Sequence, residues 1–143
     1  MRTIIMLAAA ASLAASAAQA ADRFTSTSTG EQPTLLTMPA VGAAPEIRVA
    51  HWKGAIAATF ADGVRNSTYE CVGYPGGAAG QTINVCQGKE GENTFAMRIS
   101  CMQGTGACFG TLSGTGGRYK GRVGSFVQTT TGPGKTESQG SWH

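Results

Sequence analysis

Short segments in which apolar and polar residues alternate recur about every 10 to 15 residues between positions 46 and 142. The clearest is "NTFAMRISC" (residues 93–101), where every second residue is apolar or cysteine. A period of two predicts a half-buried antiparallel strand, and glycine-bearing turns separate these segments. Because no segment carries a helical stripe of useful length, we expect an all-β fold, an antiparallel meander of about seven to eight strands. Consecutive hairpins favour a closed small β-barrel over a sandwich, because closure removes exposed strand edges.

The first 45 residues differ in texture from the rest and divide the chain into three parts. Residues 1–20 combine the basic Arg2, an Ala-rich apolar stretch and Ala18-Gln19-Ala20, a pattern typical of a cleaved secretory signal peptide. A retained membrane anchor is the alternative, which the short, alanine-rich stretch disfavours. Residues 21–45 are rich in Ser, Thr and Pro and are expected to form a flexible linker. Residues 46–143 are expected to form a single β-barrel domain.

Four cysteines lie in the predicted mature part, at Cys71, Cys86, Cys101 and Cys108. An even number of cysteines behind a signal peptide predicts disulfide bonds and a secreted or periplasmic protein of a bacterium. Three pairings are possible, and we favour Cys71–Cys86 with Cys101–Cys108, because each pair could sit across neighbouring strands. A metal site is not expected, since structural zinc sites usually bring two cysteines within two to four residues of each other. No transmembrane segment is expected in the mature protein.

The charge of the chain is weak, which argues against nucleic acid as a partner. Eleven Lys and Arg against eight Asp and Glu give a formal charge of +3, too little for a nucleic-acid-binding surface. Arg118, Lys120 and Arg122 alternate and would share one face of an extended segment. That face could bind an anion such as a carboxylate, a phosphate, a lipid head group or an acidic polymer. The alternative, which we favour, is a solvated strand face.

No catalytic constellation can be recognised, and no residue is assigned a catalytic role. His51 could exchange a proton near neutral pH, but no carboxylate or nucleophile motif stands beside it. Glu70 and Asn84 fall on adjacent predicted strands and would form a polar pair if both pointed into a barrel. Placing Tyr69 and Cys71 inward turns Glu70 outward, so that pairing is not favoured.

The stretch "LSGTGGRYKGRVGSF" (residues 112–126) is the densest glycine motif of the chain. Its glycines fit neither a dinucleotide-binding fingerprint nor a phosphate-binding loop, and the helix that both require is missing from the pattern. No cofactor is therefore expected. Tight turns between strands explain the glycines better, because glycine adopts positive φ and permits close backbone approach.

The segment "GTLSGTGGRYKGRVGSF" (residues 110–126) resembles the strand–corner–strand signature of allene-oxide-cyclase-type barrels, which include the plant dirigent proteins. In that family a Gly-Thr-Gly-x-aromatic-x-Gly stretch forms a tight corner before the next strand. The resemblance covers about 35 residues at the C-terminal end. It implies a barrel but carries no catalytic residue to this chain, because fold does not settle function.

Together these features predict an exported barrel that is not an enzyme and that binds a small apolar ligand or a protein partner. The first alternative is an isomerase or lyase of the cyclase kind, which needs little more than a shaped cavity with one or two polar groups. It requires His51, Glu70 or Asn84 beside a cavity. The second alternative is an inhibitor of a secreted hydrolase, acting through the loop "YPGGAAG" or the basic face.

Overall fold

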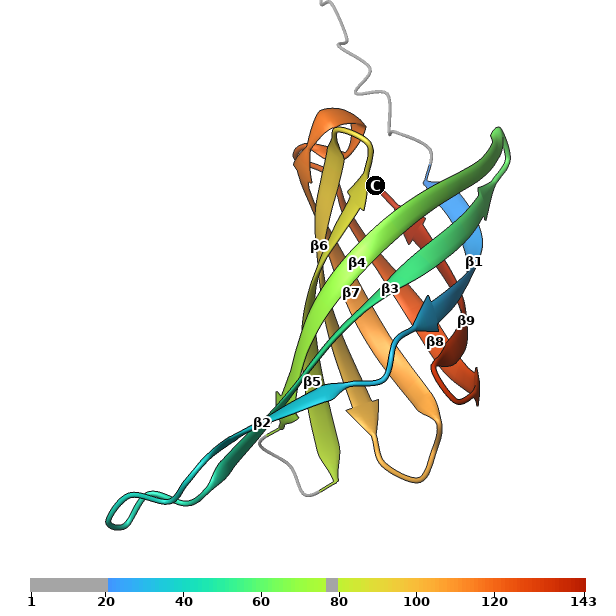
Figure 1. Cartoon of the computed structure of the whole chain (residues 1–143). Coiled ribbons are helices and arrows are strands. Elements are labelled where there is room, and N and C mark those ends of the chain that lie inside the picture. Colours follow the sequence, from blue (N-terminus) through green and yellow to red (C-terminus); the bar gives the residue numbers. More distant parts are fainter. Residues whose placement is uncertain (1–20, 77–79) are drawn as a thin grey trace, which may run out of the picture.

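The computed structural model describes residues 21–76 and 80–143. It confirms the all-β class: eight antiparallel strands close into a barrel, and one further strand extends the sheet (Figure 1). The elements are β1 (Asp22–Gly30), β2 (Thr34–Met38), β3 (Ile47–Phe60), β4 (Gly63–Pro75), β5 (Gln81–Glu90), β6 (Asn93–Met102), β7 (Ala107–Gly116), the short 3-10 helix η1 (Gly117–Tyr119), β8 (Val123–Gly132) and β9 (Lys135–Trp142).

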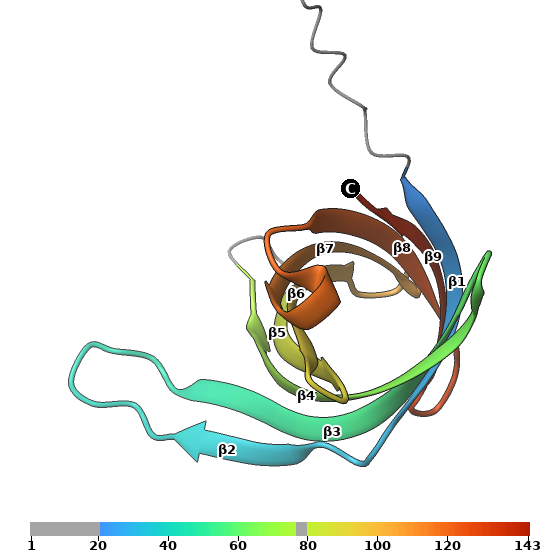
Figure 2. The ribbon, with the colours of Figure 1, turned by 90° about the horizontal axis from the view of Figure 1, so that it is seen from above.

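The first strand closes the barrel. From β3 to β9 each strand pairs with the next in sequence, and β1 lies between the two ends of this meander. Phe24 of β1 stands opposite Gly140 of β9 on one side and opposite Phe60 of β3 on the other. Figure 2 looks down the resulting ring, with η1 lying across one end of it. The signal peptide predicted at residues 1–20 lies outside the described part of the chain.

The expectation of a flexible linker at residues 21–45 is wrong, because the barrel domain already begins with β1 at Asp22. In "DRFTSTSTG" the inward positions of β1 carry Phe24, Ser26, Ser28 and Gly30, and Thr occupies most of the outward ones. Serine facing a cavity gives no contrast in hydropathy with threonine facing water. The side chains of β1 therefore alternate between the inside and the outside of the barrel without alternating in polarity. A search for a polarity pattern with period two misses such a strand.

β2 forms an arm with the first half of β3. Along one edge, β3 pairs with two strands in succession: residues 47–51 pair with β2, and residues 54–60 pair with β1. The arm projects beyond the end of the barrel opposite η1 (Figure 1). Leu35, Leu36 and Met38 are 68%, 57% and 58% exposed, so these residues do not pack on the barrel. The second part of the expected linker is thus an ordered hairpin.

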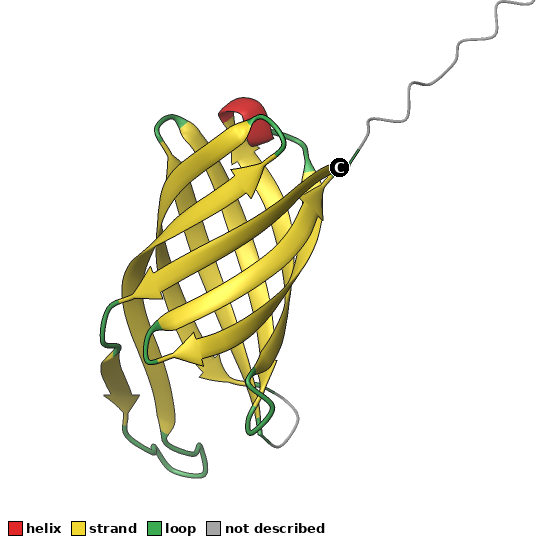
Figure 3. Cartoon of the chain, turned by 90° about the vertical axis from the view of Figure 1, so that its right-hand side faces the viewer, coloured by secondary structure: helices red, strands yellow, loops and turns green. Residues whose placement is uncertain are grey.

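The glycine-rich stretch forms a tight corner, as its composition predicted. Gly117 and Gly121 adopt positive φ of 58° and 79°, and η1 lies between the two strands that the corner joins (Figure 3). The corner turns Tyr119 into the barrel, where its ring stacks on Trp142 at a centroid distance of 4.8 Å. Phe95 packs edge-on against both rings. These aromatic side chains close one end of the barrel.

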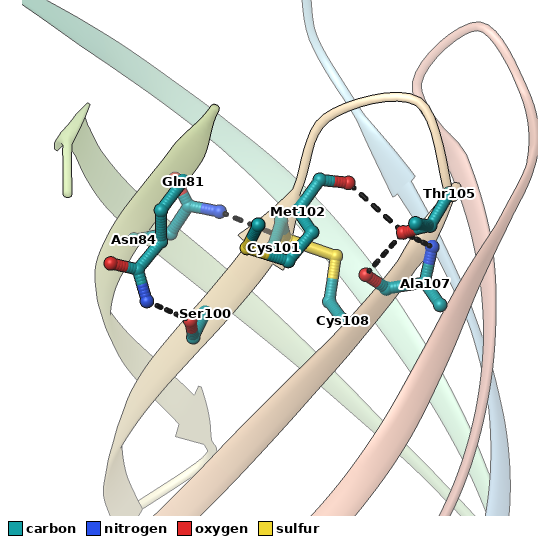
Figure 4. Close-up of a disulfide and its surroundings, with 8 residues drawn as sticks. All are labelled: Gln81, Asn84, Ser100, Cys101, Met102, Thr105, Ala107 and Cys108. Atoms are coloured by element: carbon teal, nitrogen blue, oxygen red, sulfur yellow. Dashed lines mark hydrogen bonds between the residues drawn. A yellow bond between two sulfur atoms is a disulfide. The ribbon is translucent and has the colours of Figure 1, made fainter. Parts of the chain in front are cut away.

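Both predicted disulfides are confirmed, and each joins neighbouring strands. Cys71 on β4 bonds Cys86 on β5, and their Cα atoms lie 4.0 Å apart. Cys101 on β6 bonds Cys108 on β7, with the Cα atoms 4.2 Å apart. Figure 4 shows the second bond next to the turn of the β6–β7 hairpin, where the Thr105 hydroxyl donates a hydrogen bond to the Met102 carbonyl oxygen at 3.0 Å.

Candidate functional site

The barrel interior contains a cavity of about 390 Å³. An eight-stranded barrel has an interior just wide enough to be filled by side chains or to hold one small ligand. Here the inward side chains near η1 are large and aromatic, while those that β1 and β9 place toward the other end are small. At that other end the cavity is lined by residues of the β1–β2 connection and of the β8–β9 turn, among them Glu31, Pro33 and Pro133, and by Lys135 at the start of β9. It therefore opens away from η1.

One wall of the cavity is polar. The inward positions of β1, β9 and β8 carry hydroxyl and amide side chains in two rows, which the strand register aligns. We call these six residues the polar wall: Ser26, Ser138 and Gln128 in the first row, and Ser28, Thr136 and Thr130 in the second. The Ser28 and Thr136 hydroxyl oxygens lie 2.6 Å apart and share a hydrogen bond. Above the first row stand Phe24, Gly140 and Phe126, where the aromatic end of the cavity begins.

The remaining strands provide a mainly apolar wall. Ile56, Met97, Ile99 and Leu112 line it together with the Cys71–Cys86 disulfide. Polar side chains are few on this side and come from β4 and β5: Arg65, Ser67, Tyr69 and Asn84. A cavity that is apolar on one side and hydrogen-bonding on the other can orient a ligand as well as bury it.

Trp52 and Tyr69 stand toward the mouth of the cavity. Tyr69 lies opposite Gly54 of β3, and a Cβ atom at Gly54 would lie 2.4 Å from the Tyr69 hydroxyl oxygen. The glycine therefore makes room for the phenol, whose hydroxyl donates a hydrogen bond to the Thr29 carbonyl oxygen at 3.3 Å. Burial raises the pKa of Tyr69 above its ordinary value, so this phenol stays neutral at physiological pH.

A polar network lies behind the aromatic end. The Tyr119 hydroxyl donates a hydrogen bond of 2.5 Å to the Glu90 carboxylate, which also lies 3.5 Å from the Arg118 guanidinium. Arg65 lies over the Phe60 ring and forms an ion pair of 2.7 Å with Asp62. Burial raises the pKa of Tyr119, and the hydrogen bond to the Glu90 carboxylate raises it further.

This network predicts a loss of stability in alkali. The folded protein holds Tyr119 neutral with a pKa above the unfolded value of about 10, so its contribution is complete below that pH and is lost as the pH rises through the folded pKa. Tyr119→Phe should lower the free energy of unfolding by about 1.5 kcal/mol at neutral pH and flatten its fall above pH ~10. Denaturant unfolding across this pH range measures both effects. Tyr74→Phe, at a partly exposed phenol, is the control, and equal slopes in the two variants would contradict the assignment.

The three residues of which an isomerase would require at least one beside the cavity are not brought together. His51 and Glu70 both lie on the outside of the barrel, with His51 Nε2 and Glu70 Oε1 2.6 Å apart and Lys53 Nζ 3.8 Å from the same oxygen. The hydrogen bond with His51 and the charge of Lys53 lower the pKa of Glu70. The expectation that Glu70 points outward is confirmed. Asn84 alone lines the cavity, where its amide donates a weak hydrogen bond to Cys101 Sγ at 3.7 Å.

Arg118, Lys120 and Arg122 do not share one face of an extended segment, and this expectation is wrong. Arg118 belongs to η1 and Arg122 follows the turn, because Gly117 and Gly121 bend the chain between them. Arg118 pairs with Glu90, and Arg122 pairs with Asp22 at 2.8 Å. Lys120 is exposed. Binding of an anion by these three residues stays a prediction.

The polar wall was not identified from the sequence, although one signal points to it. "TSTSTG" places Ser at two alternate positions, and "KTESQGSW" does the same with Thr136 and Ser138. The pairing of the two segments as neighbouring strands gathers these side chains. Across residues 21–76 and 80–143, no group of three His, Cys, Asp or Glu side chains could hold a metal ion. No helix in these ranges is long and apolar enough to cross a membrane.

Comparison with models of known protein families and with curated proteins finds no match to the sequence of this chain.

Proposed function

We propose that this protein binds a small, mainly apolar ligand inside its barrel. The observation that supports the proposal is the cavity of about 390 Å³, open at one end and closed by aromatic rings at the other. Its volume lies within the usual range of small-molecule sites, about 300–1,000 Å³. Such sites combine apolar walls with a few polar groups, as this cavity does.

The apolar wall supplies the driving force for binding. Ile56, Met97, Ile99 and Leu112 face the cavity together with the disulfide of β4 and β5. A ligand that covers them removes apolar surface from water, which stabilises a complex by about 25 cal/mol for each Å² buried. Strand pairing around the whole ring holds these walls in place, so little ordering is required when the ligand enters.

A side chain that fills the cavity should abolish binding. Ala58 of β3 lines the cavity, and Ala55 of the same strand faces outward and is exposed. Ala58→Phe should weaken binding of a neutral apolar fluorescent dye such as N-phenyl-1-naphthylamine at least tenfold, because the new ring occupies the space of the ligand. Fluorescence titration of the folded protein measures the affinity and the number of sites.

Ala55→Phe is the matched control, since it adds the same ring to the same strand on the opposite face. It should leave the dye affinity unchanged. A thermal unfolding curve for each variant separates loss of the cavity from loss of the fold. Equal weakening by the two variants, or no saturable binding to the wild-type protein, would refute the proposal.

Three further functions stay predictions: binding of a protein partner, an isomerase activity of the cyclase kind, and inhibition of a secreted hydrolase. Of the cavity residues that an isomerase could use, Asn84 is the one that the sequence analysis named. The loop predicted to act in inhibition includes residues 77–79, which lie outside the described part of the chain.

A further inference from the structure

The side chains in the first row of the polar wall have no hydrogen-bond partner among the described residues. Ser26, Ser138 and Gln128 stand side by side on β1, β9 and β8. Within residues 21–76 and 80–143 no hydrogen bond engages their side chains. All three point into the barrel yet remain half-buried rather than buried, because the cavity leaves them accessible. Their hydroxyl and amide groups are therefore available to a ligand.

The position of this row fixes which part of a ligand it would meet. The next inward layer toward η1 is formed by Phe24, Gly140 and Phe126. Gly140 leaves room for the two rings, since a Cβ atom there would lie 2.7 Å from Phe126 Cβ and 2.8 Å from Phe24 Cζ. A ligand whose leading end reaches these rings places its trailing part beside Ser26, Ser138 and Gln128.

Charge is scarce around this row. The charged side chains that line the cavity are Glu31 and Lys135, which lie at the mouth, and Arg65. Asp62 neutralises Arg65 with two contacts, at 2.9 and 2.7 Å. A charged ligand group buried at mid-cavity would thus meet no free charge of opposite sign among the described lining residues. Neutral hydroxyl groups match this surface, because each can both donate and accept a hydrogen bond.

We propose that the ligand is a neutral amphiphile: an apolar tail that reaches the aromatic end, joined to a head with several hydroxyl groups that bond Ser26, Ser138 and Gln128. This inference rests on the proposed binding of a small ligand in the cavity and specifies its chemistry. The head bonds the polar wall, and the chain that follows it lies against the apolar wall of β3 to β7. A tail without such a head would leave the wall hydroxyls unpaired in a site from which it displaces water.

A pair of probes with the same tail tests this class. Octyl glucoside and 1-octanol share an eight-carbon chain and differ in the polyhydroxyl head. Isothermal titration calorimetry, below the critical micelle concentration of octyl glucoside and below the solubility limit of octanol, should give an affinity for octyl glucoside at least tenfold higher than for octanol. The double variant Ser26→Ala/Ser138→Ala should reduce this preference to less than threefold and leave the affinity for octanol unchanged or higher.

Ser113→Ala/Ser125→Ala is the matched control, because both serines are exposed on the outer faces of β7 and β8. It should keep the full preference for octyl glucoside. If both probes bind the wild-type protein equally, or if the inward double variant keeps the preference, the ligand class is wrong while binding in the cavity stands. If neither probe nor the apolar dye binds, the inference and the proposed function fail together.

Discussion

Gly114→Ala is expected to destabilise the barrel by about 4 kcal/mol or more, enough to prevent folding of a marginally stable domain. A Cβ atom at Gly114 would lie 1.5 Å from the carbonyl oxygen of Tyr119 and 2.3 Å from its carbonyl carbon. Both atoms belong to the backbone, so no side-chain rotation relieves the clash. The corner would therefore have to move. Two backbone hydrogen bonds oppose this movement: the Gly114 N–H donates to the Arg122 carbonyl oxygen, and the Gly121 N–H donates to the Gly114 carbonyl oxygen.

Displacing the corner would also separate Tyr119 from Trp142 and open the aromatic end. Denaturant unfolding followed by tryptophan fluorescence measures the loss, and the yield of folded protein measures it where the variant does not fold. Gly132→Ala is the control, because Gly132 also belongs to a strand next to a turn but has no atom within 4 Å of the added carbon. It should change the free energy of unfolding by less than about 1 kcal/mol. Similar effects of the two substitutions would show that Gly114 does not make the close contact.

Removal of both disulfides is expected to cost about 5 kcal/mol. Cys71 and Cys86 are 15 residues apart, and Cys101 and Cys108 are 7 apart. Loops of these lengths correspond to about 3 and about 2 kcal/mol of stabilisation through restriction of the unfolded chain. Their sum is comparable to the whole stability of many domains of this size. Cys→Ala substitution at all four positions should therefore lower the denaturant midpoint sharply.

The two single-pair variants distinguish the contributions of the bonds. Loss of Cys71–Cys86 should be the more costly, because its loop is longer and because its sulfur atoms also line the apolar wall of the cavity. Unfolding of the wild-type protein with and without a reducing agent gives an independent measurement. A midpoint that does not move on reduction would contradict the expected effect.

The sequence predicted best those features that depend on local contrast between neighbouring residues. β6 alternates apolar with polar residues, and its strand and inward face follow directly. The cysteine pairing followed from the same argument, since residues on consecutive strands of a meander meet across the hairpin. Glu70 was placed outward because its neighbours Tyr69 and Cys71 were placed inward. In each case the pattern of one or two adjacent strands was sufficient.

The features that depend on pairing of distant segments were missed. β1 alternates Ser with Thr, which differ little in hydropathy, and its place between β3 and β9 depends on residues more than a hundred positions away. The polar wall is formed by three strands, β1, β9 and β8, in register. No short stretch of sequence therefore contains the whole set of its residues. The basic residues 118–122 were misplaced for another reason: alternation was taken to mean an extended chain, whereas glycines at 117 and 121 bend it.

The position of β1 has a consequence for the order of events when the protein is made. This strand is among the first parts of the domain to be synthesised, yet one of its two partners, β9, is the last. Until β9 emerges, the nascent sheet has two unsatisfied edges, and the ring cannot be completed. The last step of folding therefore waits for the synthesis of β9, and the free edges of β1 and β8 stay exposed to unwanted strand pairing until then.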